Sequence, residues 1–392
     1  MAIDIERQGR GFQTGRVATI SIVHAVHDTY TGFLPPLLPL FIQRLFLSKA
    51  EAGLLTIFIQ APSLLQPFIG HLADRLSLRF LVILAPAVSA IAMSLLGVAP
   101  VYGLLAILLT VAGLSSASIH SVGPVMAGRL SGTNLGRGMG FWMVGGELGR
   151  VLGPLVIVTA LEVLTPGQIP WLMAGGIVAS AILYVRMRDV PARPSEAGLP
   201  LPWSAALRAM RPLLAPLVAV IITRAFVLAA ITTYLPTFLN EGGSGLWISG
   251  AALSVVEAAG VLGALAGGSL SDRLGRRWVL AASLLSTPFF VLAFLYARGI
   301  WQLPFLVLMG FSSLAVTPVL MALVQESYPD NRALANGLYM AISFSLQGLA
   351  VVVFGAFGDA FGLRAAFVAG ALVSLAGVPA VRWLPGRPPR RE

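Results

Sequence analysis

The sequence predicts an all-α membrane protein with twelve transmembrane helices in two pseudo-symmetric six-helix bundles. Of its 392 residues, 57% are hydrophobic and only 11% are charged, whereas soluble domains carry about 45–50% apolar and about 25% charged residues. Twelve spans of about 20 residues would use nearly all of the hydrophobic residues and leave no room for a large soluble domain. The chain has no cysteine, which excludes disulfides, thiol nucleophiles and thiolate metal sites.

Twelve apolar runs mark the expected spans. In the first half they lie near 17–41, 50–70, 80–98, 102–126, 138–160 and 169–186. In the second half they lie near 213–238, 247–269, 279–297, 301–324, 335–357 and 365–384. The resulting divisions are an amino-terminal tail at 1–16, a first bundle at 17–188, a linker at 189–212, a second bundle at 213–385 and a basic tail at 386–392. The first tail lacks the pattern of a cleaved signal, so we expect the first span to stay in the membrane.

The expected linker at 189–212 is the longest polar stretch. It holds Pro191, Pro194, Pro200, Pro202 and Pro212 together with Arg193, Arg208 and Arg211. Proline-rich, charged segments of this kind are typical of extended connections. We therefore expect a cytoplasmic linker between the two bundles.

The basic residues predict the orientation of the chain. With both termini in the cytoplasm, most of the 26 Lys and Arg residues fall in cytoplasmic segments, and only Arg44, Lys49, Arg298 and Arg364 fall outside. This asymmetry follows the positive-inside rule. The net charge of +10 is therefore a topology signal, because the basic residues form no stripe with stacking aromatics that would indicate a nucleic-acid partner.

An internal repeat supports the division into two halves. The segment Gly70 to Arg75, after span two, recurs 198 residues later as Gly268 to Arg273, after span eight. The segment Asn134 to Gly140 recurs as Asn331 to Gly337. Two bundles related by an axis along the membrane normal, with a site near the midplane, are a transporter architecture.

The repeated loop is the most specific motif. Its second copy has the pattern Gly-x-x-x-Asp-Arg-x-Gly-Arg-Arg, with Gly268, Asp272, Arg273, Gly275, Arg276 and Arg277. Its first copy retains Gly70, Asp74, Arg75 and Arg79. The motif resembles the signature loop of the major facilitator superfamily. We expect the glycine to allow close helix approach and the aspartate to pair with an arginine across the bundle, as a latch whose opening lets helices separate. Simple anchoring by positive charge is the alternative.

The fifth span carries a glycine repeat. Gly145, Gly149 and Gly153 lie four residues apart, so they form one smooth ridge against which another helix can pack closely. The Gly149-x-x-x-Gly153-Pro154 portion resembles the fifth-helix motif of proton-coupled antiporters in this superfamily. Generic small-residue packing is the alternative interpretation.

Ionisable residues at membrane depth point to the functional site. They are Asp28 in span one, Glu147 and Arg150 in span five, Arg224 in span seven and Glu257 in span eight. A centred charge costs at least about 2.5–3.5 kcal/mol on insertion scales, so these side chains should face protein or a wet cavity. Spans three, six, nine and twelve carry no interior charge, and we expect them to face lipid. Three acids against two arginines leave one acid without a fixed cation, and this acid is the candidate proton carrier.

Asp28 is the favoured proton carrier. Glu147 and Arg150 can pair on one helix face, and Arg224 can meet Glu257 or Asp28 across the two halves. His24 precedes Asp28 by four residues on the same helix face. A histidine beside a buried carboxylate can exchange protons close to neutral pH.

The other histidines leave alternatives open. We expect His120 of span four to point toward the same cavity and His27 to turn away from Asp28. A static helix–helix hydrogen bond is the alternative for His24 and Asp28, and simple packing is the alternative for His120.

Two other chemistries are disfavoured. Imidazoles and a carboxylate can bind a divalent metal, but one helix turn cannot aim His24, His27 and Asp28 at one ion, so no metal site is predicted. A membrane hydrolase or acyltransferase would also use His with Asp, yet no nucleophile is placed with a base and an orienting group. We therefore expect no enzymatic activity.

Several residues together resemble the fosmidomycin-resistance-type exporters of the major facilitator superfamily over nearly the whole chain. They are His24-x-x-x-Asp28, Leu64-Leu65-Gln66-Pro67, Ser116, His120, Val144-Gly145-Gly146, Gly149, Gly153-Pro154, Gln325-Glu326, Gly337-Leu338 and Asp359. The resemblance implies an inner-membrane exporter of small, often anionic or amphiphilic compounds, driven by the proton gradient. The branch commonly has His-Pro-Glu in span four, whereas this chain has His120-Ser121-Val122, so an acidic group is missing there.

The predicted function is a proton-coupled exporter, an antiporter that works by alternating access. We expect proton coupling by Asp28, His24 and Glu257. The expected substrate contacts are Arg224, Arg150, Glu147, His120, His27 and Tyr234. Apolar contact can come from Phe33, Phe58, Phe141, Trp142 and Tyr234, for which packing is the alternative and the commoner role of such aromatics. The expected partners are a small-molecule substrate, protons and the lipid bilayer, without nucleic acid. No cofactor is expected besides the proton gradient.

The chain is expected to be a monomer in the cytoplasmic (inner) membrane, with both termini in the cytoplasm. Three alternative functions are also compatible with a membrane protein. They are a proton-linked importer of an organic anion, a divalent metal exporter and a non-transporting membrane sensor or interaction protein.

Overall fold

The computed structural model describes residues 11–66, 68, 69, 72, 78–132, 134–190, 203–327 and 332–385. Within these ranges every regular element is helical. The chain divides into two compact units, one of Met1–Leu34 with Phe58–Gly198, the other of Pro35–Ile57 with Leu199–Glu392. Residues 35–57, placed by the sequence in the first bundle, therefore belong to the unit of the second half.

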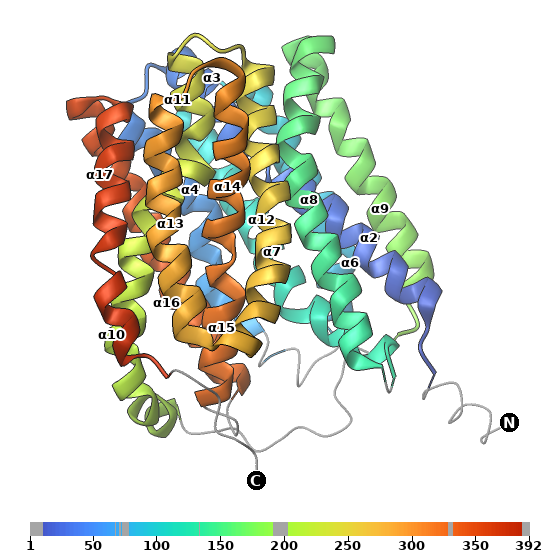
Figure 1. The fold of residues 1–392 in the computed structure, drawn as a ribbon. Helices are drawn as coiled ribbons and strands as arrows, with labels where there is room; N and C mark the ends of the chain where they lie inside the picture. Colours follow the sequence, from blue (N-terminus) through green and yellow to red (C-terminus); the bar gives the residue numbers. More distant parts are fainter. Residues whose placement is uncertain are drawn as a thin grey trace, which may run out of the picture. The chain divides into compact units, whose positions relative to one another are not determined.

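The first unit is built from long helices that share one apolar core. Its helices are α2 (Thr14–Thr31), α6 (Arg79–Leu95), α7 (Tyr102–Leu130), α8 (Leu135–Val163) and α9 (Met173–Met187), with the short helices η1 (Ala61–Leu65), η2 (Leu96–Val98) and η3 (Pro166–Leu172). Figure 1 shows α2, α6, α8 and α9 side by side. Buried residues from all five long helices, including Ile20, Val82, Val122, Trp142 and Leu183, form the core.

An ion pair outside the membrane spans joins the two ends of this unit, where the Arg16 guanidinium lies 2.8 Å from the Asp189 carboxylate. Hydrogen bonds from the backbone N–H of Asp189 and from Arg16 stabilise the charged carboxylate and lower the pKa of Asp189.

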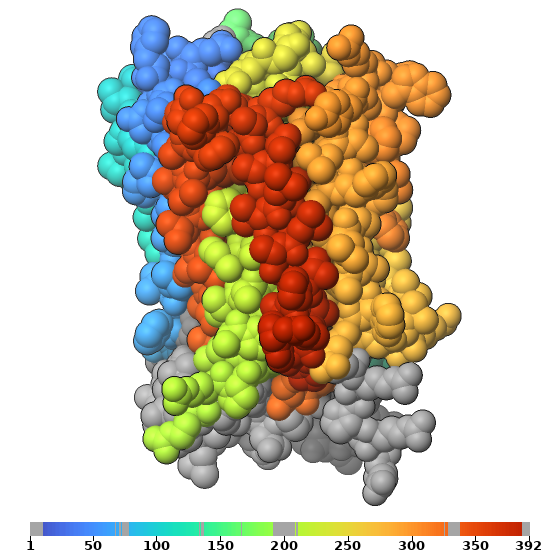
Figure 2. Space-filling view, turned by 60° about the vertical axis from the view of Figure 1, so that its left-hand side comes forward, coloured from blue at the N-terminus to red at the C-terminus, as the bar shows by residue number. Residues whose placement is uncertain are grey.

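The second unit contains the remaining helices. They are α3 (Leu34–Leu45), the start of α4 (Lys49–Gln60), α10 (Trp203–Leu228), the π-helical turn η4 (Ala229–Tyr234), α11 (Leu235–Glu241), α12 (Leu246–Leu274), α13 (Arg276–Tyr296), η5 (Gly299–Trp301), α14 (Gln302–Leu314), α15 (Val316–Ser327), α16 (Arg332–Phe361), α17 (Leu363–Leu375) and η7 (Val378–Trp383). Figure 2 shows α17 flanked by α10 and α13. Two apolar cores, one containing Phe294 and Phe367 and the other Leu217 and Leu320, hold this unit together.

The helices form the twelve-span fold that the sequence predicts. Among the described residues, ten helices are long and apolar enough to cross a membrane. The expected spans one and two correspond along the sequence to α2 with α3 and to α4 with η1. Span one is broken at Gly32 and Phe33, between α2 and α3. Pro35 and Pro36 follow directly, and because proline has no backbone N–H, neither can donate the helical hydrogen bond that would continue α2.

Two expectations about individual segments need correction. The predicted linker ends earlier, since α10 begins at Trp203 and contains both Pro212 and Pro216. A proline removes a single backbone hydrogen bond, and neighbouring helices and waters can compensate for that loss in a membrane span.

The second correction concerns span three. It was expected to face lipid, yet 61% of its most apolar window is buried, against 28% for span six. The absence of charge therefore does not by itself place a span at the lipid boundary.

Residues 35–57 are anchored to the second unit at the start of α4. The Asp359 carboxylate of α16 accepts hydrogen bonds from the backbone N–H groups of Lys49 (2.8 Å) and Ala50 (3.0 Å). These are donors of the first helical turn, which lack partners inside the helix and favour a negative charge. The Lys49 ammonium lies 3.1 Å from Glu241 and 3.9 Å from Asp359. Asp359, which the sequence singles out only by resemblance, therefore caps α4.

Candidate functional site

The glycine ridge of α8 lies directly against α2. A Cβ atom on Gly145, Gly149 or Gly153 would lie 2.2, 2.4 or 2.7 Å from the backbone oxygens of Ser21, Ala25 and Thr29, respectively. Both sets of residues are four apart, so the two helices stay in register over more than two turns. Only a residue without a Cβ allows this approach. The ridge therefore holds α2, the helix that carries His24 and Asp28, against α8.

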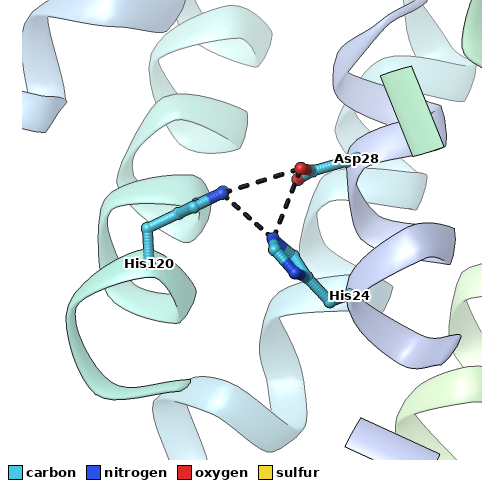
Figure 3. A group of neighbouring side chains, drawn as sticks. All are labelled: His24, Asp28 and His120. Carbon is cyan, nitrogen blue, oxygen red and sulfur yellow. Dashed lines mark hydrogen bonds and ion pairs between the residues drawn. The ribbon is translucent and has the colours of Figure 1, made fainter. Parts of the chain in front are cut away.

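Three polar side chains of the first unit meet next to this contact (Figure 3). His24 and Asp28 come from α2 and His120 comes from α7. The Nε2 atoms of His24 and His120 are 3.2 Å apart. The Asp28 Oδ2 atom lies 3.3 Å from Nε2 of His24 and 3.7 Å from Nε2 of His120. The structure thus brings together three residues that span 97 positions of the sequence.

Backbone carbonyls orient both imidazoles. His24 Nδ1 lies 3.0 Å from the Trp142 carbonyl oxygen, and His120 Nδ1 lies 2.9 Å from the Ser116 carbonyl oxygen. A carbonyl oxygen only accepts hydrogen bonds, so each Nδ1 is assigned as the protonated nitrogen. In both neutral rings Nε2 then carries a lone pair, and both Nε2 atoms face the Asp28 carboxylate.

Trp142 supports the cluster in a way that the sequence did not predict. Of its two expected roles, substrate contact or packing, the structure shows packing: its ring is buried and stacks on His24 with centroids 3.8 Å apart. Gly123 of α7 makes room for it, since a Cβ there would lie 2.2 Å from the indole. Gly146 borders the cluster from α8, because its Cβ would lie 3.1 Å from both His24 Nε2 and Asp28 Oδ2.

The burial of the three side chains differs. The side chains of His24 and Asp28 are 4% and 9% exposed, whereas that of His120 is 33% exposed. His120 is therefore the accessible edge of the cluster. His27 was expected to contact substrate, but it is fully buried, and neither of its ring nitrogens has a hydrogen-bond partner. In this structure it serves as a packing residue beside Asp28, with its Nε2 4.0 Å from Oδ1.

The other ionisable residues divide between the two units. In the first unit, Arg150 donates a hydrogen bond to Glu147 on α8, as their spacing predicts. In the second unit, Arg224 of α10 is buried and donates to the Ser313 carbonyl oxygen (2.8 Å) and to Thr317 Oγ1 (2.9 Å). The Nε of Arg224 has no hydrogen-bond partner. Glu257 is buried on α12.

Tyr234 is a structural residue in this conformation. It was expected to contact substrate, but it is fully buried, and its hydroxyl donates to the carbonyl oxygens of Lys49 (2.7 Å) and Val351 (3.1 Å). Gly53 and Gly355 leave room for it, since a Cβ on either would lie within 2.4 Å of the hydroxyl. Tyr234 thus ties α4 to α16 within the second unit.

The second copy of the loop motif forms a charge network. Arg276 is buried, lies 2.7 Å from Asp272 and 2.6 Å from Glu326, and also donates to Ser271. Gly275 has a φ of +97°, a left-handed conformation that favours glycine. Arg277 donates to the Leu384 carbonyl oxygen, and Arg273 is exposed.

In the second copy of the loop motif, the glycine that allows close helix approach is not the one that the sequence predicts. Gly268 was expected to allow close helix approach, but a Cβ there would meet nothing within 4 Å. The neighbouring Gly267 makes the close contact, 2.8 Å from the Ala315 carbonyl oxygen. In the first copy Gly70, Asp74 and Arg75 lie outside the described residues, and Arg79 begins α6.

Comparison with known families identifies the fold. A family model of the Major Facilitator Superfamily matches residues 20–267 and 248–392. The chain belongs to the Major Facilitator Superfamily. Members of this superfamily are transporters, so this facilitator is a multi-pass membrane transporter of small molecules, as the sequence predicts.

Relatives of this facilitator include efflux-type proteins. The fosmidomycin resistance protein of Escherichia coli (strain K12) is 26% identical over 356 residues, which cover 88% of this chain and 86% of that protein. The multidrug resistance protein MdtG of Serratia proteamaculans (strain 568) is 24% identical over 382 residues, which cover 92% and 91%. These matches agree with the branch that the sequence motifs resemble.

Solved structures share the fold. A bacterial homologue of the human lysosomal transporter Spinster, in an inward-facing and unoccupied conformation, superposes with a TM-score of 0.80 at 16% identity, covering 95% of this chain and 98% of that one. The nucleoside transporter NupG superposes with a TM-score of 0.73 at 15% identity, covering 94% and 98%. At these identities the likeness establishes the fold alone.

Proposed function

We propose that this facilitator is a proton-coupled exporter of small anionic or amphiphilic compounds, including drugs, working by alternating access. It acts as a monomer in the cytoplasmic membrane with both termini in the cytoplasm. The efflux-type relatives support the direction of transport. The observation that carries the proposal is the buried cluster of His24, Asp28 and His120 in the first unit.

The hydrogen-bond inventory of the cluster supports proton binding. With both Nδ1 atoms donating to carbonyls, two neutral imidazoles would present lone pairs to each other at 3.2 Å beside a carboxylate. One added proton turns the His24–His120 contact into a hydrogen bond and gives Asp28 a cationic neighbour. The three groups thus share one exchangeable proton, and the exposed edge of His120 is its path to water.

Arg224 supports an anionic substrate group. Its guanidinium is buried and bonded only to neutral oxygens in the contacts above, with Nε still without a partner. A buried cation is stabilised by an anionic partner, and a guanidinium matches carboxylate and phosphonate oxygens in a bidentate manner. Arg224 is therefore the proposed anion contact, and Arg150 with Glu147 the proposed polar contacts in the first unit.

The function is tested by substrate flux in proteoliposomes. Purified protein is reconstituted, fosmidomycin and a panel of other anionic and amphiphilic drugs are loaded in turn, and a pH gradient of either sign is imposed. We expect substrate to move against the direction of the protons, with proton flux that depends on substrate. Substrate movement in the same direction as the protons would instead establish an importer. A substrate flux that does not change with the pH gradient would exclude proton coupling.

Arg224→Lys should weaken transport of anionic substrates selectively. Lysine keeps the charge but loses the fork that spans Ser313, Thr317 and the substrate anion. We expect the KM for anionic drugs to rise about tenfold, equal to about 1.4 kcal/mol of binding free energy, with little change for cationic drugs. Thr317→Val is the matched control, since it removes one arginine contact and keeps the guanidinium. Equal losses for anionic and cationic drugs would contradict the assignment.

A further inference from the structure

We propose that His24, Asp28 and His120 form a binding site for a divalent d-block cation, with Zn²⁺ as the expected ion. The inference goes beyond the proposed function and does not depend on it, because an ion can bind here whether or not protons drive transport. It rests on the positions of three ligand atoms, on the direction of the two imidazoles and on the hydrogen bonds behind them.

The three ligand atoms are spaced as a bound ion requires. The two Nε2 atoms and the Asp28 Oδ2 atom form a triangle with sides of 3.2, 3.3 and 3.7 Å. A point equidistant from the three atoms lies about 2.0 Å from each, which matches Zn–N and Zn–O bonds of about 2.0–2.2 Å. An ion can therefore bind all three groups without movement of α2 relative to α7.

The imidazoles point at this central position. Their ring centroids are 5.0 Å apart and their planes are inclined by 74°, whereas their Nε2 atoms are only 3.2 Å apart. The rings therefore converge with their Nε2 atoms leading, as Figure 3 shows. With each Nδ1 donating to a backbone carbonyl, the Nε2 lone pairs are the free ones. Such outer hydrogen bonds fix the tautomer and orientation of metal-ligating histidines.

The ligand set indicates the kind of ion. Two imidazoles and one carboxylate suit zinc and neighbouring d-block metals rather than Ca²⁺ or Mg²⁺, which prefer oxygen ligands. Three protein ligands leave a fourth tetrahedral position for water. The sequence argued against a metal site because one helix turn cannot aim His24, His27 and Asp28 at one ion. That argument still applies to His27, but α7 supplies His120 as the third ligand instead.

A bound ion would take the place of the shared proton. The site has room for a single cation between the three groups, so metal and proton exclude each other. His120 is the one ligand with a substantially exposed side chain, and an ion reaches the cluster past it. The ion would also link α2 to α7 across the first unit.

Metal binding is tested on the full-length protein in detergent after removal of metals by a chelator. Equilibrium dialysis with Zn²⁺ and elemental analysis give stoichiometry and affinity, and the visible absorption of added Co²⁺ reports its ligands. We expect one ion per chain, with at least about 100-fold weaker binding in His120→Ala. His71→Ala is the matched histidine control and should bind like wild type. Folding of each variant is checked by its thermal unfolding midpoint.

A second pair of variants tests the space beside the ligand His24 and leaves all three ligands in place. In Gly146→Ala the new methyl would lie 2.6 Å from His24 Cε1 and 3.1 Å from its Nε2, so it displaces the ring and should lower the affinity at least about tenfold. Gly140→Ala on the same helix meets nothing within 4 Å and should leave binding unchanged.

Two results would overturn the metal site. One is the absence of any Zn²⁺ bound to folded wild-type protein, and the other is wild-type affinity in both His120→Ala and His24→Ala. Neither involves substrate or a pH gradient, so the proton-coupled function would stand or fall separately by its own flux assay. Conversely, failure of proton coupling would leave the dialysis result unchanged.

Discussion

Asp28→Asn should abolish transport driven by a pH gradient while the protein still folds and reaches the membrane. The amide has the size of the carboxylate but cannot ionise, so the proton shared with His24 and His120 loses its anionic neighbour. A hydrogen bond to a charged group contributes about 1.5–3 kcal/mol, which equals roughly a tenfold to hundredfold change in proton affinity. We expect gradient-driven efflux to fall at least about tenfold.

The assay should separate coupling from substrate movement. Exchange of labelled for unlabelled substrate across the proteoliposome needs no net proton transfer, so Asp28→Asn should retain it. Asp189→Asn is the matched control, because Asp189 is an exposed aspartate of the same unit that pairs with Arg16. Wild-type rates of gradient-driven efflux in Asp28→Asn would remove Asp28 from the mechanism.

Gly149→Ala should destabilise the first unit. Its new Cβ would lie 2.4 Å from the Ala25 carbonyl oxygen and 2.7 Å from the Cβ of Asp28, both on α2. Because backbone atoms cannot rotate away, the helices must separate, and overpacking of this kind costs about 1–3 kcal/mol. The measurement is the thermal unfolding midpoint of purified protein in detergent, which should fall clearly below that of wild type.

Gly140→Ala is the matched control for helix packing. Gly140 lies on α8 as well, but a Cβ there has no atom within 4 Å. Its alanine variant should therefore match wild type or exceed it slightly, since alanine favours the helix over glycine. Equal destabilisation by the two substitutions would show that α8 does not depend on close contact with α2.

Much of the fold could be predicted because it depends on local composition. Membrane spans need long apolar runs, and the observed helices match the expected runs with ends that extend a few residues further. The helix α10 is the largest extension, because Pro212 and Arg211 read as linker while the structure continues the helix back to Trp203. The assignment of residues 35–57 to the second unit was not predictable, because it depends on tertiary contacts between distant parts of the chain, such as the bonds of Asp359 to the start of α4.

The candidate site was only partly visible in the sequence. The spacing of four places His24 and Asp28 on one face of a helix, and the rarity of charge in apolar spans marks Asp28 and Arg224. The role of Trp142 carries no such signal, because its carbonyl and ring meet His24 only through the packing of α8 on α2. His27 and Tyr234 are both enclosed in this structure, because polar residues at membrane depth can be covered by packing as well as exposed to substrate, and residue type alone does not distinguish the two.

The sequence by itself determined the membrane-spanning fold, the two-fold repeat, the superfamily motifs and the positions of the rare buried charges. These properties depend on residue type and on spacing along one helix. Only the tertiary structure decided that His120 joins His24 and Asp28 around one central position and that backbone carbonyls hold both Nδ1 atoms. The physical reason is that these contacts join residues about a hundred positions apart, and their geometry is set by how closely the glycines of α8 allow α2 to approach.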